Sequence, residues 1–285
     1  MRIAVFGSTG LVGTYLCAEI ARAGHEAIGA GTSAAGARLD ASDAAAVEGF
    51  FASAKPGVAI NAIKSGMSTD ECESRKAEAW KSNVDAAGNI SRAAAGHGCR
   101  MVHLSSDWVY EGREGEVYGE ESPLYPQNFY AFTKAIAEER VLCHSPSALV
   151  LRTTGVFGMD PKGRDFFSRF HASAKRGEPF GCADDQFSQP IFAGELARAA
   201  IRLVVAGAHG TYNAVGNDYV SRHGLALLFC SAFGLDPRLA KPVHSSERKI
   251  RVPMHLRLNT GKISRIAPIA PLGRQVEELK RQVEK

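Results

Sequence analysis

The chain lacks a strong excess of charge of either sign. Its 34 basic and 30 acidic side chains leave a formal net charge of +4 over 285 residues, and no basic tract concentrates that charge. A balance this small argues against a nucleic acid or an anionic membrane surface as the partner. A charged fraction of 22% beside 45% hydrophobic residues also excludes an intrinsically disordered chain. We therefore expect a globular protein with one large core, or with a core and a smaller lobe.

Long hydrophobic runs and paired cysteines are also absent. No window approaches the roughly 20 apolar residues that a membrane-spanning helix needs, and the first residues lack the features of a secretory signal. The six cysteines stand singly, with no pair at the spacing of a metal knuckle or a redox motif. These absences predict a cytoplasmic protein with reduced thiols, no membrane association and no bound metal.

Short β-branched segments alternate with longer helical patterns through the first half of the chain. We expect strands near residues 2–6, 26–30, 57–61, 100–105 and 148–152, and helices from Leu11 and near 41–54, 76–96 and 129–143. Parallel strands need long crossover connections, and helices usually supply them. The alternation therefore predicts an α/β fold with a doubly wound parallel sheet.

The regular alternation weakens after Gly158. Helical patterns near 164–176, 193–206 and 221–233 predict a smaller α/β lobe that faces the substrate. We expect residues 1–158 to form the nucleotide-binding domain, and residues 159–285 to form mainly this lobe, with some segments returning to the core of the first domain. An amphipathic helix over 274–285 either packs on the body or binds a partner.

The first expected strand leads into a glycine-rich turn and then into a helix. The turn residues are Gly7, Ser8, Thr9, Gly10, Leu11, Val12 and Gly13, so its glycines are spaced three apart. Glycine permits positive φ and lets a phosphate approach the amides at the helix N-terminus. Because the turn follows a first strand and opens a helix, it predicts a Rossmann-type dinucleotide site rather than a glycine turn without a ligand.

The end of the second expected strand carries no acidic residue. An NAD-preferring protein commonly places an Asp or Glu there to bind the ribose hydroxyl. Thr32, Ser33 and the later Arg38 can instead bind a 2′-phosphate, which favours NADP(H). NAD(H) stays an alternative, since a single arginine often just faces solvent. Asp40 either caps the next helix or lines the adenine pocket.

Two further segments supply candidate catalytic groups. Tyr130 and Lys134 lie four residues apart on an expected helix, so one turn places both on the same face. An ammonium near a phenol favours the phenolate, and we expect Lys134 to lower the pKa of Tyr130. Ser105 and Ser106 end the fourth strand at the sheet edge where α/β folds bind ligands. Ser106 can hydrogen-bond a substrate oxygen beside Tyr130, or the two serines act only as turn caps.

These segments together resemble the extended short-chain dehydrogenase/reductase family and, within it, the dTDP-4-dehydrorhamnose reductase group. The likeness covers nearly the whole chain. It rests on the glycine turn, the Tyr130 and Lys134 pair, and residues 38–43, 58–62, 104–112, 151–154 and 184–190. The Asp185-Gln186-Phe187 run is the most specific of these for the group.

The resemblance implies a reductase that transfers hydride from NADPH to a small-molecule keto-sugar, with a nucleotide-linked sugar expected, while Tyr130 protonates the developing alkoxide. It assigns the catalytic triad to Ser106, Tyr130 and Lys134. The residues expected to contact the substrate are Ser106, Asp107, Trp108 and Gln186, and Trp108 is expected there because it lies beside Ser106. The cofactor contacts from the turn and the resemblance are Gly7, Thr9, Gly10, Leu11, Val12, Gly13, Thr32, Ser33, Arg38, Asp40, Ala41, Ala62, Ile63, Lys64, Ser105, Tyr130 and Lys134.

The chain departs from the group's pattern where a nucleotide-sugar would be held. Trp108 stands where tyrosine is usual, and Gly155 stands where an aromatic residue is usual. Val252 and Leu256 replace an arginine and a serine, for which Arg251 or Arg257 can compensate. Losing a guanidinium and a hydroxyl removes polar contacts that a charged diphosphate would use.

Two other functions stay open from the sequence. One is an epimerase or dehydratase-like member of the same superfamily that acts on nucleotide-sugars, and the other is a non-catalytic NADP-binding regulatory subunit. Intact Ser106, Tyr130 and Lys134 favour chemistry over a purely regulatory role. A homodimer is compatible with the sequence, which gives no evidence on oligomeric state.

Overall fold

The computed structural model describes residues 1–33, 36–160, 162–247 and 250–284. Its centre is a seven-stranded sheet in the order β11-β6-β5-β4-β1-β2-β3, in which every neighbouring pair is parallel. These strands are β1 (Arg2–Phe6), β2 (Glu26–Gly31), β3 (Ala37–Arg38), β4 (Val58–Asn61), β5 (Arg100–Ser106), β6 (Leu149–Thr153) and β11 (Gly210–Asn213). The sheet confirms the predicted doubly wound α/β fold.

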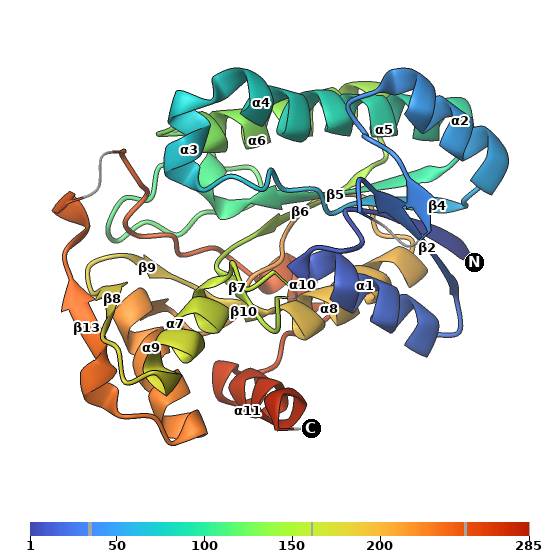
Figure 1. Cartoon of the computed structure of the whole chain (residues 1–285). Helices are drawn as coiled ribbons and strands as arrows, with labels where there is room; N and C mark the ends of the chain where they lie inside the picture. Colours follow the sequence, from blue (N-terminus) through green and yellow to red (C-terminus); the bar gives the residue numbers. More distant parts are fainter. Residues whose placement is uncertain (34–35, 161, 248–249, 285) are drawn as a thin grey trace.

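Helices cover both faces of this sheet (Figure 1). One face carries α2 (Ala44–Ala54), α3 (Thr69–Ser74), α4 (Lys76–Trp80), α5 (Ala86–Gly96) and α6 (Phe129–His144), and the other carries α1 (Leu11–Arg22) and α8 (Ala193–Val205). The helix predicted over 76–96 is continuous in direction, but a π-helical segment, Lys81–Asp85, joins α4 to α5. The three-layer arrangement follows from the need to bury both faces of a parallel sheet.

Alternate residues of the strands pack into the two hydrophobic cores of this domain, one on each face of the sheet. Ile3 and Val5 of β1 pack in the layer with α1 and α8. Ala4 and Phe6, on the opposite face, pack in the layer with α2 and α5. Because successive side chains of a strand point to opposite faces, an unbroken apolar run is what a strand buried on both sides requires.

The described residues of the smaller lobe form short strands and helices. Its strands form three two-stranded sheets: β7 (Val156–Phe157) with β10 (Ile191–Phe192), β9 (Phe187–Ser188) with β12 (Val220–Ser221), and β8 (Phe180–Ala183) with β13 (Ala240–Val243). Its helices are α7 (Phe166–Lys175), α9 (Arg222–Phe233) and α11 (Leu272–Val283), and they enclose a third core rich in phenylalanine.

Among the described residues, three elements from the second half of the chain pack with the first domain. Strand β11 pairs with β6 at the edge of the main sheet, and the short helix α10 (Gly261–Ser264) lies beside it. Helix α8 packs along α1. None of the helices described in the structure is long and apolar enough to cross a membrane.

Candidate active site

The glycine turn joins β1 to α1 in a form that only glycine allows. Gly7 has φ of +82°, and the amide of Gly10 donates to the Gly7 carbonyl at 3.0 Å. A Cβ added to Gly13 would lie 2.1 Å from that same carbonyl oxygen, so the helix can approach the turn only without a side chain there. In the described part of the chain, no side chain caps the N-terminus of α1. The turn therefore fits a dinucleotide pyrophosphate.

The loop after β4 lies against this turn. A Cβ at Gly7 would meet the Ala62 carbonyl oxygen at 3.0 Å and the Ile63 amide nitrogen at 3.1 Å. Farther along the loop, the Lys64 ammonium donates to the Met67 carbonyl at 3.2 Å. The structure thus places Ala62 and Ile63 directly beside the phosphate turn.

The residues predicted to recognise a 2′-phosphate gather at the end of β2. The Arg38 guanidinium donates through Nε to the Thr32 carbonyl at 3.1 Å, which holds β3 against this loop. The hydroxyls of Thr9 and Ser33 lie 3.4 Å apart, so the loop also reaches the glycine turn. Thr32, Ser33 and Arg38 are exposed and can reach a charged group in solvent.

Asp40 does not cap a helix, and that alternative from the sequence is wrong. Asp43 caps α2 instead, accepting from the amides of the helix's second and third residues. Asp40 accepts from the amide and the hydroxyl of Ser42 at 2.9 and 2.7 Å, and lies 3.6 Å from the Lys81 ammonium. The neighbouring Ala41 is buried. Asp40 is exposed, so its proposed place beside the adenosine stays a prediction.

Ser106, Tyr130 and Trp108 meet at the carboxyl edge of the sheet. Ser106 is the last residue of β5, and Tyr130 lies in the first turn of α6. The Ser106 hydroxyl is hydrogen-bonded to the Tyr130 phenol and accepts from the Trp108 amide at 3.2 Å, so it also caps the turn that follows. The Trp108 ring stands edge-on to the Tyr130 ring, with centroids 5.9 Å apart.

Lys134 lies one turn farther along α6, almost fully buried. Its ammonium donates to the Leu104 carbonyl of β5 at 2.7 Å, and burial lowers its pKa to about 8. The predicted lowering of the pKa of Tyr130 is wrong for this structure, because burial of the phenol raises that pKa to about 12. Loss of water around a phenolate outweighs the hydrogen bond from Ser106, which by itself lowers the pKa. The Lys134 ammonium donates instead to a backbone carbonyl.

Asp107 is a buried carboxyl beside this cluster. Its Oδ1 accepts from the Ser106 hydroxyl at 3.2 Å, and burial raises its pKa to about 7. The Thr154 side chain and the positive charge of Arg222 oppose that rise. The sequence analysis missed both residues. Thr154 directly follows the end of β6, and its place at the carboxyl end of a strand could have identified it as a site residue. Arg222 begins α9 in the smaller lobe, and no local sequence pattern indicates that it lies near the site.

Gln186 holds together two segments of the smaller lobe. It is buried, and its amide donates to the Pro253 carbonyl at 3.3 Å. Val252 and Leu256, in the segment around that proline, are both buried apolar residues. The Arg257 guanidinium lies 5.8 Å from the centre of the Tyr219 ring. Gln186 therefore shapes the lobe, and its direct contact with a substrate stays a prediction.

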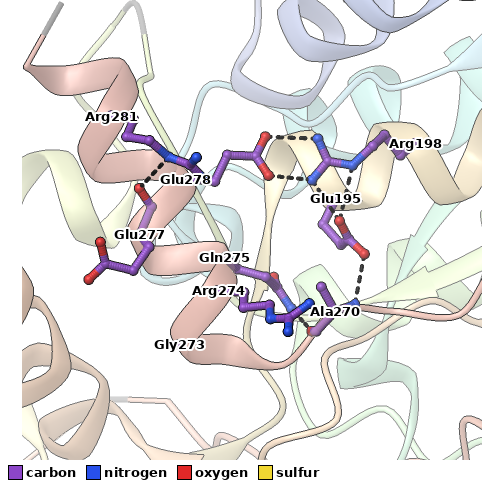
Figure 2. A pocket seen from close by; sticks show the side chains of 9 residues that line it. All are labelled: Glu195, Arg198, Ala270, Gly273, Arg274, Gln275, Glu277, Glu278 and Arg281. Atoms are coloured by element: carbon purple, nitrogen blue, oxygen red, sulfur yellow. Dashed lines mark hydrogen bonds and ion pairs between the residues drawn. The ribbon is translucent and has the colours of Figure 1, made fainter.

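A cavity of about 490 Å³ lies elsewhere, between α8 and α11. Figure 2 shows Arg198 at its wall, joined to the carboxylates of Glu195 and Glu278, each at 2.6 Å. None of the site residues predicted above lines this cavity. No group of His, Cys, Asp and Glu within the described residues could hold a metal ion.

Known proteins are similar to this chain in both sequence and fold. The family model described as "RmlD substrate binding domain" matches residues 1–284. A dTDP-4-dehydrorhamnose reductase of Mycobacterium tuberculosis is 31% identical over 251 residues, which span 86% of this chain and 80% of that protein. A solved dTDP-4-dehydrorhamnose reductase from Clostridium acetobutylicum has a TM-score of 0.90 at 23% identity, with 100% of both chains covered. Another, from Bacillus anthracis in complex with NADP, has a TM-score of 0.89 at 20% identity and covers 100% of this chain and 98% of its own.

Proposed function

The chain belongs to the RmlD substrate binding domain family, and from that membership we propose that it is an NADPH-dependent reductase of a nucleotide-linked keto-sugar. The observation that carries the proposal is the Tyr130 phenol, hydrogen-bonded to Ser106 at the sheet edge with Lys134 one turn away. Relatives named dTDP-4-dehydrorhamnose reductase support a dTDP-linked 4-keto sugar as the substrate. The turn at Gly7 and Gly13 fits the dinucleotide.

The residues divide the proton chemistry of a ketone reduction between them. NADPH, when bound, supplies the hydride that adds to the carbonyl carbon. The Ser106 hydroxyl hydrogen-bonds the carbonyl oxygen, and Tyr130 gives its phenolic proton to the alkoxide that develops there. The phenol carries its proton at neutral pH, and burial raises its pKa farther above neutrality, from 10.0 to about 12. The Lys134 ammonium stabilises the phenolate that remains.

The two parts of the chain have separate tasks in this proposal. Residues 1–158 hold the cofactor, and residues 159–285 mainly bind the sugar, with β11 and α8 completing the first domain. A cytoplasmic location is part of the proposal, and the free thiols of all six cysteines support it.

The Tyr130→Phe variant tests the proposed function. Purified protein should oxidise NADPH in the presence of a dTDP-linked 4-keto-6-deoxyhexose and yield the matching alcohol by mass spectrometry. Loss of the proton donor should lower kcat by about 10²- to 10⁴-fold while NADPH binding is retained. Tyr125→Phe is the matched control, because that tyrosine is 60% exposed. Full activity in Tyr130→Phe would refute the assignment, and NADPH binding without reduction of any keto-sugar would favour a regulatory subunit.

A further inference from the structure

The Ser106 hydroxyl has more partners than it has protons. It donates to Asp107 Oδ1 at 3.2 Å, accepts from the Trp108 amide at 3.2 Å, and is hydrogen-bonded to Tyr130. A hydroxyl carries one proton. While that proton points at Asp107, Ser106 has none to offer to the carbonyl oxygen of a substrate.

We infer that Asp107 is a positioning residue for the reduction: in its neutral form it donates a hydrogen bond to Ser106 Oγ and thereby turns the Ser106 proton toward the substrate carbonyl. The ionised carboxylate can only accept, so it draws the Ser106 proton away from the substrate. This inference rests on the proposed reductase function. It concerns the direction of one hydrogen bond and moves no further proton or electron pair.

The surroundings of Asp107 allow both forms near neutrality. Asp107 is 1% exposed. Its carboxyl is hydrogen-bonded to the Ser106 hydroxyl at 3.2 Å and to the Thr154 side chain. The charged and titratable groups that face it are Arg222 at the start of α9 and Tyr130 on α6, together with the neutral Thr154 side chain. Burial outweighs the attraction of Arg222 and raises the pKa of Asp107 to about 7.

The Asp107→Asn variant tests the inference, because its amide can donate to Ser106 at every pH. A group with a pKa of 7 is about nine-tenths protonated at pH 6 and about one-tenth at pH 8. We therefore expect the ratio of kcat/KM, variant over wild type, to rise about tenfold from pH 6 to pH 8. Deprotonation of Lys134 affects both proteins alike. A merely structural role for Asp107 would lower kcat/KM equally at both pH values, which would overturn the inference.

Asp165→Asn is the matched control. Asp165 is another buried carboxyl, with a pKa raised to about 6, and it caps α7. Its variant should keep the pH profile of the wild type, and a profile changed as in Asp107→Asn would overturn the inference. Infrared spectra add a readout without activity: a carboxylic-acid band titrating near pH 7 should vanish in Asp107→Asn, and its persistence would count against the inference.

The outcomes separate this inference from the function on which it rests. An active wild type whose pH profile is unchanged in Asp107→Asn overturns the inference alone. A wild type that reduces no keto-sugar at any pH overturns the proposed function, and the inference with it.

Discussion

At the scale of single residues, Gly13 decides whether the cofactor turn can form. A Cβ at this position would lie 2.1 Å from the Gly7 carbonyl oxygen, inside van der Waals contact. Gly13→Ala must therefore separate α1 from the turn, and we expect NADPH affinity to fall by about tenfold or more, equivalent to at least ~1.4 kcal/mol. Isothermal titration with NADPH measures the loss.

The control for that substitution is Gly49→Ala. Gly49 is exposed in α2 and has no atom within 4 Å of an added Cβ. Alanine is the better helix former, so this variant should bind NADPH as the wild type does and be slightly more stable. Equal affinity in Gly13→Ala and the wild type would contradict the role of the turn.

Arg38 is the residue on which the choice between NADPH and NADH depends. Its hydrogen bond to the Thr32 carbonyl keeps the guanidinium at the rim where the 2′-phosphate is expected. A charge-assisted hydrogen bond contributes about 1.5–3 kcal/mol, so Arg38→Ala should weaken NADPH binding by about 10- to 100-fold and leave NADH binding unchanged.

Fluorescence titration with each cofactor checks this preference. Arg176→Ala serves as the control, since Arg176 is an exposed arginine paired with Glu178. A wild type with equal affinity for NADPH and NADH would refute the 2′-phosphate site.

At the scale of elements, a buried ion pair fixes the helix that carries the catalytic residues. Nη2 of Arg152 in β6 lies 2.7 Å from Oε2 of Glu138 in α6, and the two side chains are 7% and 3% exposed. Arg152 also donates to the Tyr110 hydroxyl at 2.7 Å. Tyr130 and Lys134 precede Glu138 on the same helix, so this pair holds them at the edge of the sheet.

Glu138→Gln leaves the Arg152 charge buried without its counterion. Breaking a buried pair in this way costs about 3–5 kcal/mol, and urea unfolding should show a loss of that size. Glu178→Gln, which breaks an exposed pair with Arg176, should change the free energy of unfolding by less than about 1 kcal/mol. Similar values for the two variants would show that the buried pair does not anchor α6.

Local signals allowed most helices and strands to be predicted to within a few residues. Asn128 caps α6 and Asp165 caps α7 through side-chain hydrogen bonds to the first-turn amides, and such caps depend only on neighbouring residues. The two-residue strands of the smaller lobe escaped prediction. They pair segments far apart in the chain, as Val156 of β7 does with Ile191 of β10, and a strand this short has no periodicity to detect.

At the scale of the whole molecule, elements from the second half of the chain pack into the first domain. We therefore expect the first domain and the smaller lobe to unfold together. Strand β11 completes the main sheet, α8 packs on α1, and the Arg198–Glu278 ion pair ties α8 to α11 (Figure 2). Both tryptophans, Trp80 and Trp108, lie in the first half. Their fluorescence therefore reports that half, while far-ultraviolet circular dichroism reports the whole chain.

Coincident transitions by the two probes are the expected result, and NADPH should shift both to higher temperature by the same amount. A circular dichroism transition that leaves the tryptophan fluorescence unchanged would show that the smaller lobe unfolds separately.

The sequence by itself determined the fold class, the glycine turn and the Tyr130 and Lys134 pair, because each depends on periodicity or spacing within a short stretch of chain. Only the tertiary structure decided what surrounds those groups. It brings Arg222 to face Asp107 from the other lobe. It also raises the pKa of Tyr130, where spacing alone predicted a lowering. A pKa depends on burial, and burial is set by every element that packs around a side chain rather than by its neighbours in sequence.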